Sequence, residues 1–267
     1  MTDISSSGSR LFHRLGVSAS FDGERLTVDL DPQPGVLHQG VVRISLLAYL
    51  VDVVAAIPID SDPDLWAFTT DMSVRARPIP APESVRAVGT TLRQGRRSVT
   101  CAARLTDPAG DEVATAAIGF TTVARRAGDP RKPEISLERA SELVGSDERL
   151  ALPLRDEAGI EVVDPAAGVV EVPVTADLQN PAGTLQGAIV ALVAEAAAED
   201  LLSAHHGEPV VVTELDLRYL AQTRAGPVRT SARLLGDHPG APVEVLLTDV
   251  STGAVTTHAF ARGVPVP

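Results

Sequence analysis

Cysteine, lysine and aromatic residues are scarce in this sequence. The single cysteine, Cys101, excludes an internal disulfide framework and fits a reducing compartment, so we predict a cytoplasmic protein. Aromatic residues make up 3% of the chain, so aliphatic and alanine side chains must fill its core. With 267 residues, 44% of them hydrophobic, the chain is long enough for one large or two ordinary domains.

Positive charge and long apolar runs are scarce as well. The net charge of -12 argues against a nucleic acid partner. The most apolar run, residues 41–59, contains Arg43 and Asp52, which favours a buried helix and predicts no membrane association. No two histidines have metal-ligand spacing with acidic partners, and no dinucleotide or Walker loop is present. We therefore predict that the protein holds no metal and no cofactor.

The chain contains an internal repeat. Residues 70–75, Thr-Asp-Met-Ser-Val-Arg, match residues 213–218 at an offset of 143, and Gln39-Gly40 matches Gln186-Gly187 at an offset of 147. Each copy has a strand pair, one long apolar helix and a run of strands. We predict an α+β fold in which each sheet curls around its helix, because a sheet must bury one face. The predicted domains are residues 11–123 and 158–267, joined by a linker at 124–157.

Two carboxylates interrupt the apolar helix of the second copy. Glu195 lies in its middle, and Glu199 follows one turn later on the same face. An ionised carboxylate in a core is strongly destabilising unless it has a partner. Glu195 therefore either lines a cavity, where it is a candidate for catalysis, or is a structural carboxylate that hydrogen-bonds the backbone.

The second copy resembles the hotdog thioesterases, and most closely the acyl-CoA thioesterases of the phenylacetate pathway. That motif is an Asn, a His-Gly-Gly six residues later, and an acidic residue seven positions beyond the second Gly. Asn180, Gln186-Gly187-Ala188 and Glu195 stand at these positions. In the first copy Gln39-Gly40-Val41 replaces His-Gly-Gly, and Asp52 stands at the counterpart of Glu199. The resemblance implies a tandem double hotdog.

The resemblance also implies a reaction, the hydrolysis of an acyl-CoA thioester to free acid and CoA. Amides at a helix N-terminus would polarise the thioester carbonyl, and a helix carboxylate would attack it or activate water. One composite site would pair Glu195 with the turn formed by His38, Gln39, Gly40 and Val41. The other would pair Asp52 with Asn180, Gln186, Gly187 and Ala188. We expect Glu195, rather than Asp52, to be the catalytic carboxylate.

Further roles follow from the same comparison. Gly187 and Gly40 are expected to supply amide donors, and Arg75 and Arg218 are candidates for binding the CoA phosphates, since guanidinium forks suit phosphate. Two other functions stay open. The substitutions at both His-Gly-Gly positions would suit a non-catalytic protein that binds acyl-CoA or lipid, and a hotdog hydratase or dehydratase would need an Asp/His pair that the sequence does not show. An exposed sheet edge predicts a homo-oligomer, a dimer or trimer of double hotdogs.

Overall fold

The computed structural model describes residues 10–81, 83–129, 132, 134–145, 148–238 and 240–266. The first repeat contains α1 (Arg10–His13), β1 (Val17–Phe21), β2 (Leu26–Leu30), η1 (Pro34–Val36), β3 (Leu37–His38), β4 (Val41–Val42), α2 (Ile44–Asp60), β5 (Leu65–Ala76), β6 (Val85–Gln94), β7 (Ser98–Thr106) and β8 (Glu112–Ala124). Two short helices follow, α3 (Ala140–Leu143) and α4 (Leu154–Glu157). The strand pair predicted for the first copy is confirmed, because β1 and β2 pair antiparallel.

The second repeat also has a strand pair, a 3-10 turn, a long helix and four strands in this order, but among the described residues it has no strands equivalent to β3 and β4. It contains β9 (Glu161–Asp164), η2 (Pro165–Ala167), β10 (Val169–Val172), η3 (Ala176–Leu178), α5 (Gly187–His206), β11 (Val210–Tyr219), β12 (Val228–Leu234), β13 (Val243–Asp249) and β14 (Ala254–Pro265). The domain boundaries themselves stay a prediction.

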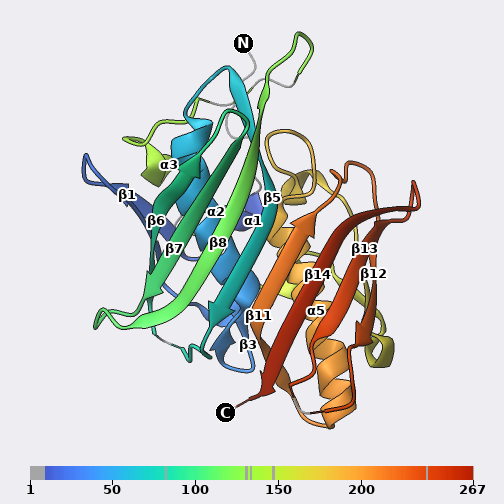
Figure 1. The fold of residues 1–267 in the computed structure, drawn as a ribbon. Helices are drawn as coiled ribbons and strands as arrows, with labels where there is room; N and C mark the ends of the chain where they lie inside the picture. Colours follow the sequence, from blue (N-terminus) through green and yellow to red (C-terminus); the bar gives the residue numbers. More distant parts are fainter. Residues whose placement is uncertain are drawn as a thin grey trace.

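The two repeats share one antiparallel sheet of 12 strands in the order β1-β2-β6-β7-β8-β5-β11-β14-β13-β12-β10-β9. Each half of this order is the mirror of the other, and β5 and β11 meet at the centre (Figure 1). Both central strands carry a register irregularity at equivalent positions, between Thr69 and Asp71 in β5 and between Val212 and Glu214 in β11. The two repeats are therefore alike even in the positions of their β-bulges.

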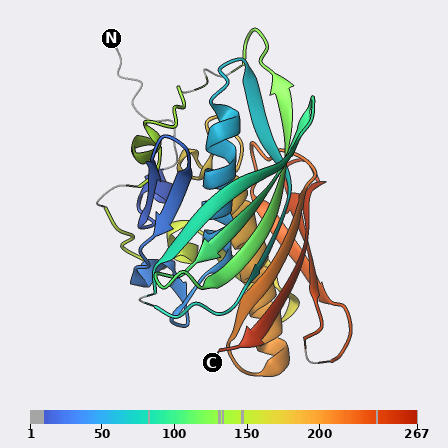
Figure 2. The same ribbon diagram turned by 60° about the vertical axis from the view of Figure 1, so that its left-hand side comes forward.

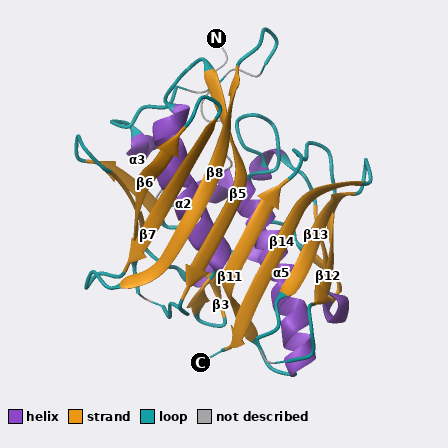
Figure 3. Ribbon diagram, in the orientation of Figure 1, coloured by secondary structure: helices purple, strands orange, loops and turns teal. Residues whose placement is uncertain are grey.

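The long helices α2 and α5 contact each other and cover the same face of the sheet (Figures 2 and 3). Both are apolar on nearly every side, which is why the sheet curves around them and why their side chains form one continuous core. The helix α5 ends at His206 and is followed by Gly207, whose φ of 73° is the left-handed conformation that favours glycine after a helix. Among the described residues, no helix is both long enough and apolar enough to cross a membrane.

The start of α2 differs from our prediction. The helix begins at Ile44 with Arg43 as its N-cap, whereas α5 begins at Gly187 with Gln186 as its N-cap. Arg43, and not Gln39, is therefore the counterpart of Gln186, at the offset of 143 that also relates the central strands. The same offset makes Asp52 the counterpart of Glu195. Our alignment of Asp52 with Glu199 was wrong, because it was drawn from the Gln-Gly pair.

Candidate active site

Two composite sites lie between the helices. Because α2 and α5 are related by the pseudo-symmetry of the repeat, the carboxylate in the middle of each helix approaches the N-terminus of the other. Asp52 of α2 lies beside Gln186 and Gly187 at the start of α5, and the three residues line a common cavity. Glu195 of α5 contacts Ile44 and Ser45 at the start of α2. The structure thus places Asp52 beside the predicted Gln186 and Gly187, whereas Glu195 contacts Ile44 and Ser45 and not the Gln39-Gly40 turn.

Asp52 is held by two neutral hydrogen-bond donors. The hydroxyl Oγ1 of Thr69, on β5, donates to Asp52 Oδ1 over 2.9 Å. The side chain of Gln186 also hydrogen-bonds Asp52. Since Gln186 Oε1 accepts the Ala188 N–H, its amide Nε2 is the group that faces the carboxylate. These contacts orient Asp52 without neutralising its charge.

The surroundings of Asp52 favour a base that works near neutral pH. Burial raises its pKa to about 6, and the nearby charge of Asp60 acts in the same direction. The hydrogen bonds from Thr69 and Gln186 oppose this rise because they stabilise the ionised form. A carboxylate that titrates near the working pH and lines a cavity is typical of a general base.

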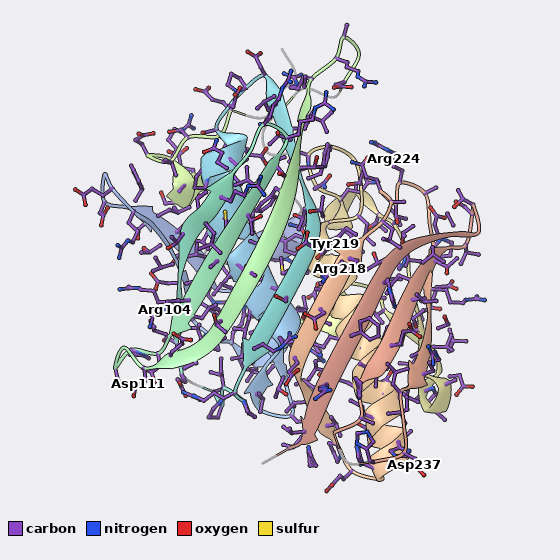
Figure 4. All side chains as sticks on the ribbon, in the orientation of Figure 1. Arg104, Asp111, Arg218, Tyr219, Arg224 and Asp237 are labelled. Carbon is purple, nitrogen blue, oxygen red and sulfur yellow. The ribbon has the colours of Figure 1, made fainter. Side chains whose placement is uncertain are left out.

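The N-terminus of α5 faces the same cavity. Gly187 lines it, and the Gly187 N–H makes no hydrogen bond with a described residue. The hydroxyl of Tyr219, at the end of β11, donates to the Gly187 carbonyl over 3.1 Å and holds this turn in place (Figure 4). A Cβ atom at Gly187 would meet Tyr219 atoms at 3.5 Å or more, so the glycine is not required by close packing. A free amide at the positive end of a helix is suited to hold a developing oxyanion.

Ala188 and Asn180 are used differently. The Ala188 N–H is already bonded by Gln186, so this amide is not available to a substrate. Asn180 builds the turn before the helix, because its Oδ1 accepts the N–H groups of Ala182 and Thr184 over 3.0 and 3.2 Å. Asn180 also lines the cavity, and its Nδ2 makes no hydrogen bond with a described residue. Asn180 can therefore build the turn and face the cavity at the same time.

The cavity has two parts. A narrow chamber of about 160 Å³ contains Asp52, Thr69 and Gln186. A wider cleft of about 620 Å³ shares Trp66, Thr69, Asn180 and Gly187 with the chamber and extends toward Tyr219 and the exposed Arg126 and Arg224. The cleft is large enough for the extended part of a substrate, and the chamber for a small group beside Asp52.

Glu195 lies in a closed site. It is 1% exposed, and its Oε1 accepts the Ile44 N–H over 2.9 Å, while Oε2 accepts both the backbone N–H and the hydroxyl of Ser45. Glu195 therefore fills the position at the α2 N-terminus where a substrate oxygen would have to bind. The hollow beside Ser45 measures about 10 Å³, which is about the least that one water molecule occupies.

A buried charge cluster completes this closed site. Arg43 Nη1 lies 2.8 Å from Glu199 Oε2 and 3.8 Å from Glu195 Oε2, and all three side chains are buried. His38 lies next to them, with Nε2 3.8 Å from Glu199 Oε2. Burial and the Arg43 charge lower the pKa of His38, while burial raises the pKa of Glu195 and Glu199 against the opposing charge of Arg43. The cluster forms an ionic contact between the repeats.

The turn that we placed at the start of α2 lies elsewhere. Gln39 and Gly40 form the exposed tip between β3 and β4, with φ values of 51° and 79°. Val41 is buried in β4. The Gly40 carbonyl accepts the Ala81 N–H over 3.0 Å. Because the helix starts at Ile44, Gly40 does not supply a helix N-terminal amide, and that prediction is wrong.

The two candidate arginines lie outside the cavities. Arg75 Nη2 pairs with Asp216 Oδ2 over 2.7 Å, and Arg75 Nε lies 3.4 Å from Glu214 Oε2. Arg218 precedes Tyr219 on β11 and is exposed on the opposite face of the sheet (Figure 4). Neither arginine is among the described residues that line the chamber or the cleft. Arg126 and Arg224 do line the cleft.

Comparisons with known proteins establish the fold. No family model and no curated protein matches the sequence. Among solved structures, the tesB protein of Mycobacterium avium subsp. paratuberculosis superposes with a TM-score of 0.64 at 14% identity, covering 98% of this chain and 100% of that one. The 12:0-ACP thioesterase of Umbellularia californica gives a TM-score of 0.62 at 14% identity, covering 92% and 100%.

A third match extends the same pattern. An acyl-ACP thioesterase of Bacteroides thetaiotaomicron gives a TM-score of 0.59 at 10% identity and covers 89% of this chain and 97% of that one. The predicted α+β fold of two tandem hotdog repeats, the fold of these thioesterases, is therefore confirmed.

Sequence reasoning missed Thr69 and Tyr219. Thr69 could have been found from its position, since it lies just before the repeated Thr-Asp segment on the strand that follows the helix. Tyr219 lies one residue beyond the repeated segment and is one of two tyrosines. No group of three His, Cys, Asp or Glu side chains in the described part of the chain is arranged to hold a metal ion. The expected absence of metal and cofactor stays a prediction.

Proposed function

We propose that the protein hydrolyses an acyl-CoA thioester and that Asp52, not Glu195, is the catalytic carboxylate. The observation that carries the proposal is the position of Asp52 in a cavity, beside an unbonded amide at the N-terminus of α5. The fold supports the same reaction class, because the solved structures that share it are named as thioesterases. Fold alone does not determine function, so the site carries the argument.

The geometry suggests a general-base mechanism. Ionised Asp52 takes a proton from a water molecule as the water oxygen attacks the thioester carbonyl carbon. The negative charge that develops on the carbonyl oxygen is stabilised by the Gly187 N–H and the positive end of α5. The tetrahedral intermediate then collapses, the C–S bond breaks, and the CoA thiolate receives the proton from Asp52. Thr69 and Gln186 hold the carboxylate in the orientation that the water requires.

The cleft is the natural place for the CoA moiety. Arg126 and Arg224 line it, and both are exposed to solvent. Arg224 is also positioned by its hydrogen bond to the Ala182 carbonyl over 3.0 Å. Guanidinium groups suit phosphate, so we expect these two arginines, rather than Arg75 and Arg218, to contact the CoA phosphates.

The test is the release of free thiol from a panel of acyl-CoA esters of increasing chain length. The wild-type protein should release CoA from at least one ester, and Asp52→Asn should slow that release by about 10²- to 10⁴-fold. Asp29→Asn is the matched control, because it changes a carboxylate that pairs with Arg86 on the outside of the fold. Tight binding of acyl-CoA without turnover would instead support the non-catalytic binding protein.

A hydratase is not favoured by the site. That reaction class would be expected to use an Asp/His pair, and among the described residues that line the chamber and the cleft none is a histidine. His38, the histidine that we considered a candidate, lies in the closed Glu195 site.

A further inference from the structure

One face of α2 forms the floor of the chamber. Asp52, Ala56 and Asp60 are four residues apart and therefore lie on the same side of the helix, and all three line the chamber. Ala56 leaves room between the two carboxylates because its side chain is a single methyl group. The chamber thus runs from the proposed catalytic Asp52 to a second carboxylate two helical turns away.

At the far end of the chamber lies Asp60, which forms an ion pair with Lys132. Lys132 Nζ lies 3.1 Å from Asp60 Oδ1 and also donates to the carbonyls of Asp62 and Leu65 over 2.8 and 2.6 Å. Its three N–H donors are therefore all used. Asp60 Oδ1 also accepts the Ala67 N–H over 3.1 Å, but Oδ2 has no hydrogen-bond partner among the described residues. The end wall accordingly offers one free acceptor.

The size of the chamber limits the acyl group. At the roughly 10–15 Å³ that one water molecule requires, a volume of about 160 Å³ holds on the order of ten groups of that size, so the length of the chamber, and not its volume, is the limit. Eight residues of helix separate Asp52 from Asp60 by roughly 12 Å. Contacts of about 3 Å at each end leave at most about 6 Å, or roughly five bonds, for the acyl chain. The length therefore favours a short acyl group of about five or six atoms.

The charges in the chamber determine which chemical group fits at the far end of the acyl chain. Lys132 balances Asp60, so the end wall is neutral overall but still has the free oxygen Oδ2. A carboxylate on the substrate would be repelled by Asp52 and could not donate to Asp60 Oδ2. The Asp60 side chain is 21% exposed, so a methyl group would displace water from Oδ2 without replacing its hydrogen bond, which is unfavourable. A neutral hydroxyl satisfies both conditions.

We propose that the substrate is the thioester of a short hydroxyacyl group, with its hydroxyl at the far end donating to Asp60 Oδ2. This inference rests on the proposed thioesterase function of the Asp52 site. It makes Asp60 the residue that sets acyl specificity, with Lys132 as the residue that positions it. Trp66, whose ring centroid lies 5.6 Å from Lys132 Nζ, covers the pair from the side.

The test compares kcat/KM for three CoA esters of similar length. They are 5-hydroxypentanoyl-CoA, hexanoyl-CoA, which has a methyl in place of the hydroxyl, and glutaryl-CoA, which has a carboxylate. The wild-type protein should prefer the hydroxyacyl ester to each of the others by about tenfold or more, since a site built for a hydrogen bond rejects an analogue that lacks it. Dodecanoyl-CoA, which exceeds the chamber, should react more slowly still.

Substitution of Asp60 should weaken the preference for the hydroxyacyl ester. In Asp60→Asn the amide oxygen can keep the bonds to Lys132 and Ala67, and the amide nitrogen then faces the chamber as a donor. The preference for the hydroxyacyl ester over glutaryl-CoA should fall at least fivefold. Asp62→Asn is the control, because Asp62 is a neighbouring exposed acid whose side chain bonds the Asp64 N–H instead of lining the chamber. The ratio of two substrates within one variant is unaffected by a partial loss of folded protein.

Each result separates this inference from the function on which it rests. Turnover without preference for the hydroxyl, or with best activity on dodecanoyl-CoA, would overturn the specificity proposal and leave the thioesterase proposal in place. An unchanged ratio in Asp60→Asn would also overturn it. Failure to hydrolyse any CoA ester would overturn both.

Discussion

The two composite sites carry equivalent carboxylates but have opposite characters. Asp52 opens on a cavity and accepts hydrogen bonds from neutral side chains, whereas Glu195 is enclosed and bonded to the backbone of the facing helix. Burial raises the pKa of both carboxyl groups, so a raised pKa does not distinguish them. Whether a buried carboxylate can react therefore depends on its hydrogen-bond partners and its access to a cavity, and not on its pKa alone.

Four pairs of equivalent residues account for this difference. At the offset of 143, Gln186 corresponds to Arg43, Thr69 to Val212, Ala56 to Glu199, and Ala188 to Ser45. In the open site, Gln186 Oε1 caps its own helix, so Asp52 does not have to occupy the helix N-terminus. In the closed site the Arg43 side chain does not cap its helix, and Glu195 does so instead. Glu199 then supplies the counter-charge for Arg43.

The largest difference between the two sites is expected from the single substitutions Asp52→Asn and Glu195→Gln. Loss of a general base lowers a rate by about 10²- to 10⁴-fold, so Asp52→Asn should lower kcat by that amount. Glu195→Gln should leave kcat within about threefold of wild type in the folded fraction. Steady-state thiol release at pH 7.5 measures both. The opposite pattern would return the catalytic role to Glu195.

The next largest effect is expected on stability at the closed site. Glu199→Ala leaves the Arg43 guanidinium buried without its nearest counter-charge, and breaking a buried ion pair from one side lowers the free energy of unfolding by about 3–5 kcal/mol. Urea denaturation checks this value. A loss below about 1 kcal/mol would mean that water reaches the cluster and that the site is not closed.

The pH dependence should report the open site. Because the pKa of Asp52 is raised to about 6 and the ionised form is the base, kcat/KM should fall about tenfold for each pH unit below 6 and level off above 7. A pH–rate profile in Glu195→Gln should show the same limb. A limb that moves in Glu195→Gln would contradict the assignment to Asp52.

A smaller loss of activity is expected for Thr69→Val. This change gives the open site a valine, as the closed site has at the equivalent Val212. Removing a hydrogen bond to a charged group is worth about 1.5–3 kcal/mol, so kcat/KM at neutral pH should fall about tenfold or more. Since the Thr69 hydroxyl lowers the pKa of Asp52, the acid limb should also move to higher pH. Thr100→Val, on the exposed face of β7, serves as the control.

The smallest expected effect is that of Tyr219→Phe. This change removes only the hydrogen bond to the Gly187 carbonyl, which is worth about 0.5–1.5 kcal/mol. It should therefore reduce kcat by less than about tenfold with KM little changed. A rise in KM alone would show instead that Tyr219 contacts the substrate in its ground state.

The sequence contained most of the fold. Apolar helices long enough to be buried, strands with alternating patterns and the repeated Thr-Asp segment together predicted two sheets curled around two helices. The helix register was missed because we aligned the two helices on the Gln-Gly pair, which is a short match. The strand match at an offset of 143 is longer, and the same offset pairs Asp52 with Glu195.

The character of each site was harder to predict. Sequence indicates that a carboxylate is buried, but whether Arg43 or a neutral side chain approaches it depends on the crossing of α2 and α5. Asp60 and Lys132 are separated by 72 positions, and nothing in the local pattern indicates that they meet. Contacts of this kind depend on tertiary structure, which is why the chamber could not be predicted.

The shared sheet has a consequence for how the molecule could evolve. In a symmetric dimer of single repeats, every substitution occurs twice, so a residue that closes one site also closes the other. Joining both repeats through β5 and β11 in one polypeptide removes that constraint, and each half can change alone. One helix–helix interface can then become a closed contact that stabilises the fold, while the other keeps a cavity in which a substrate can bind.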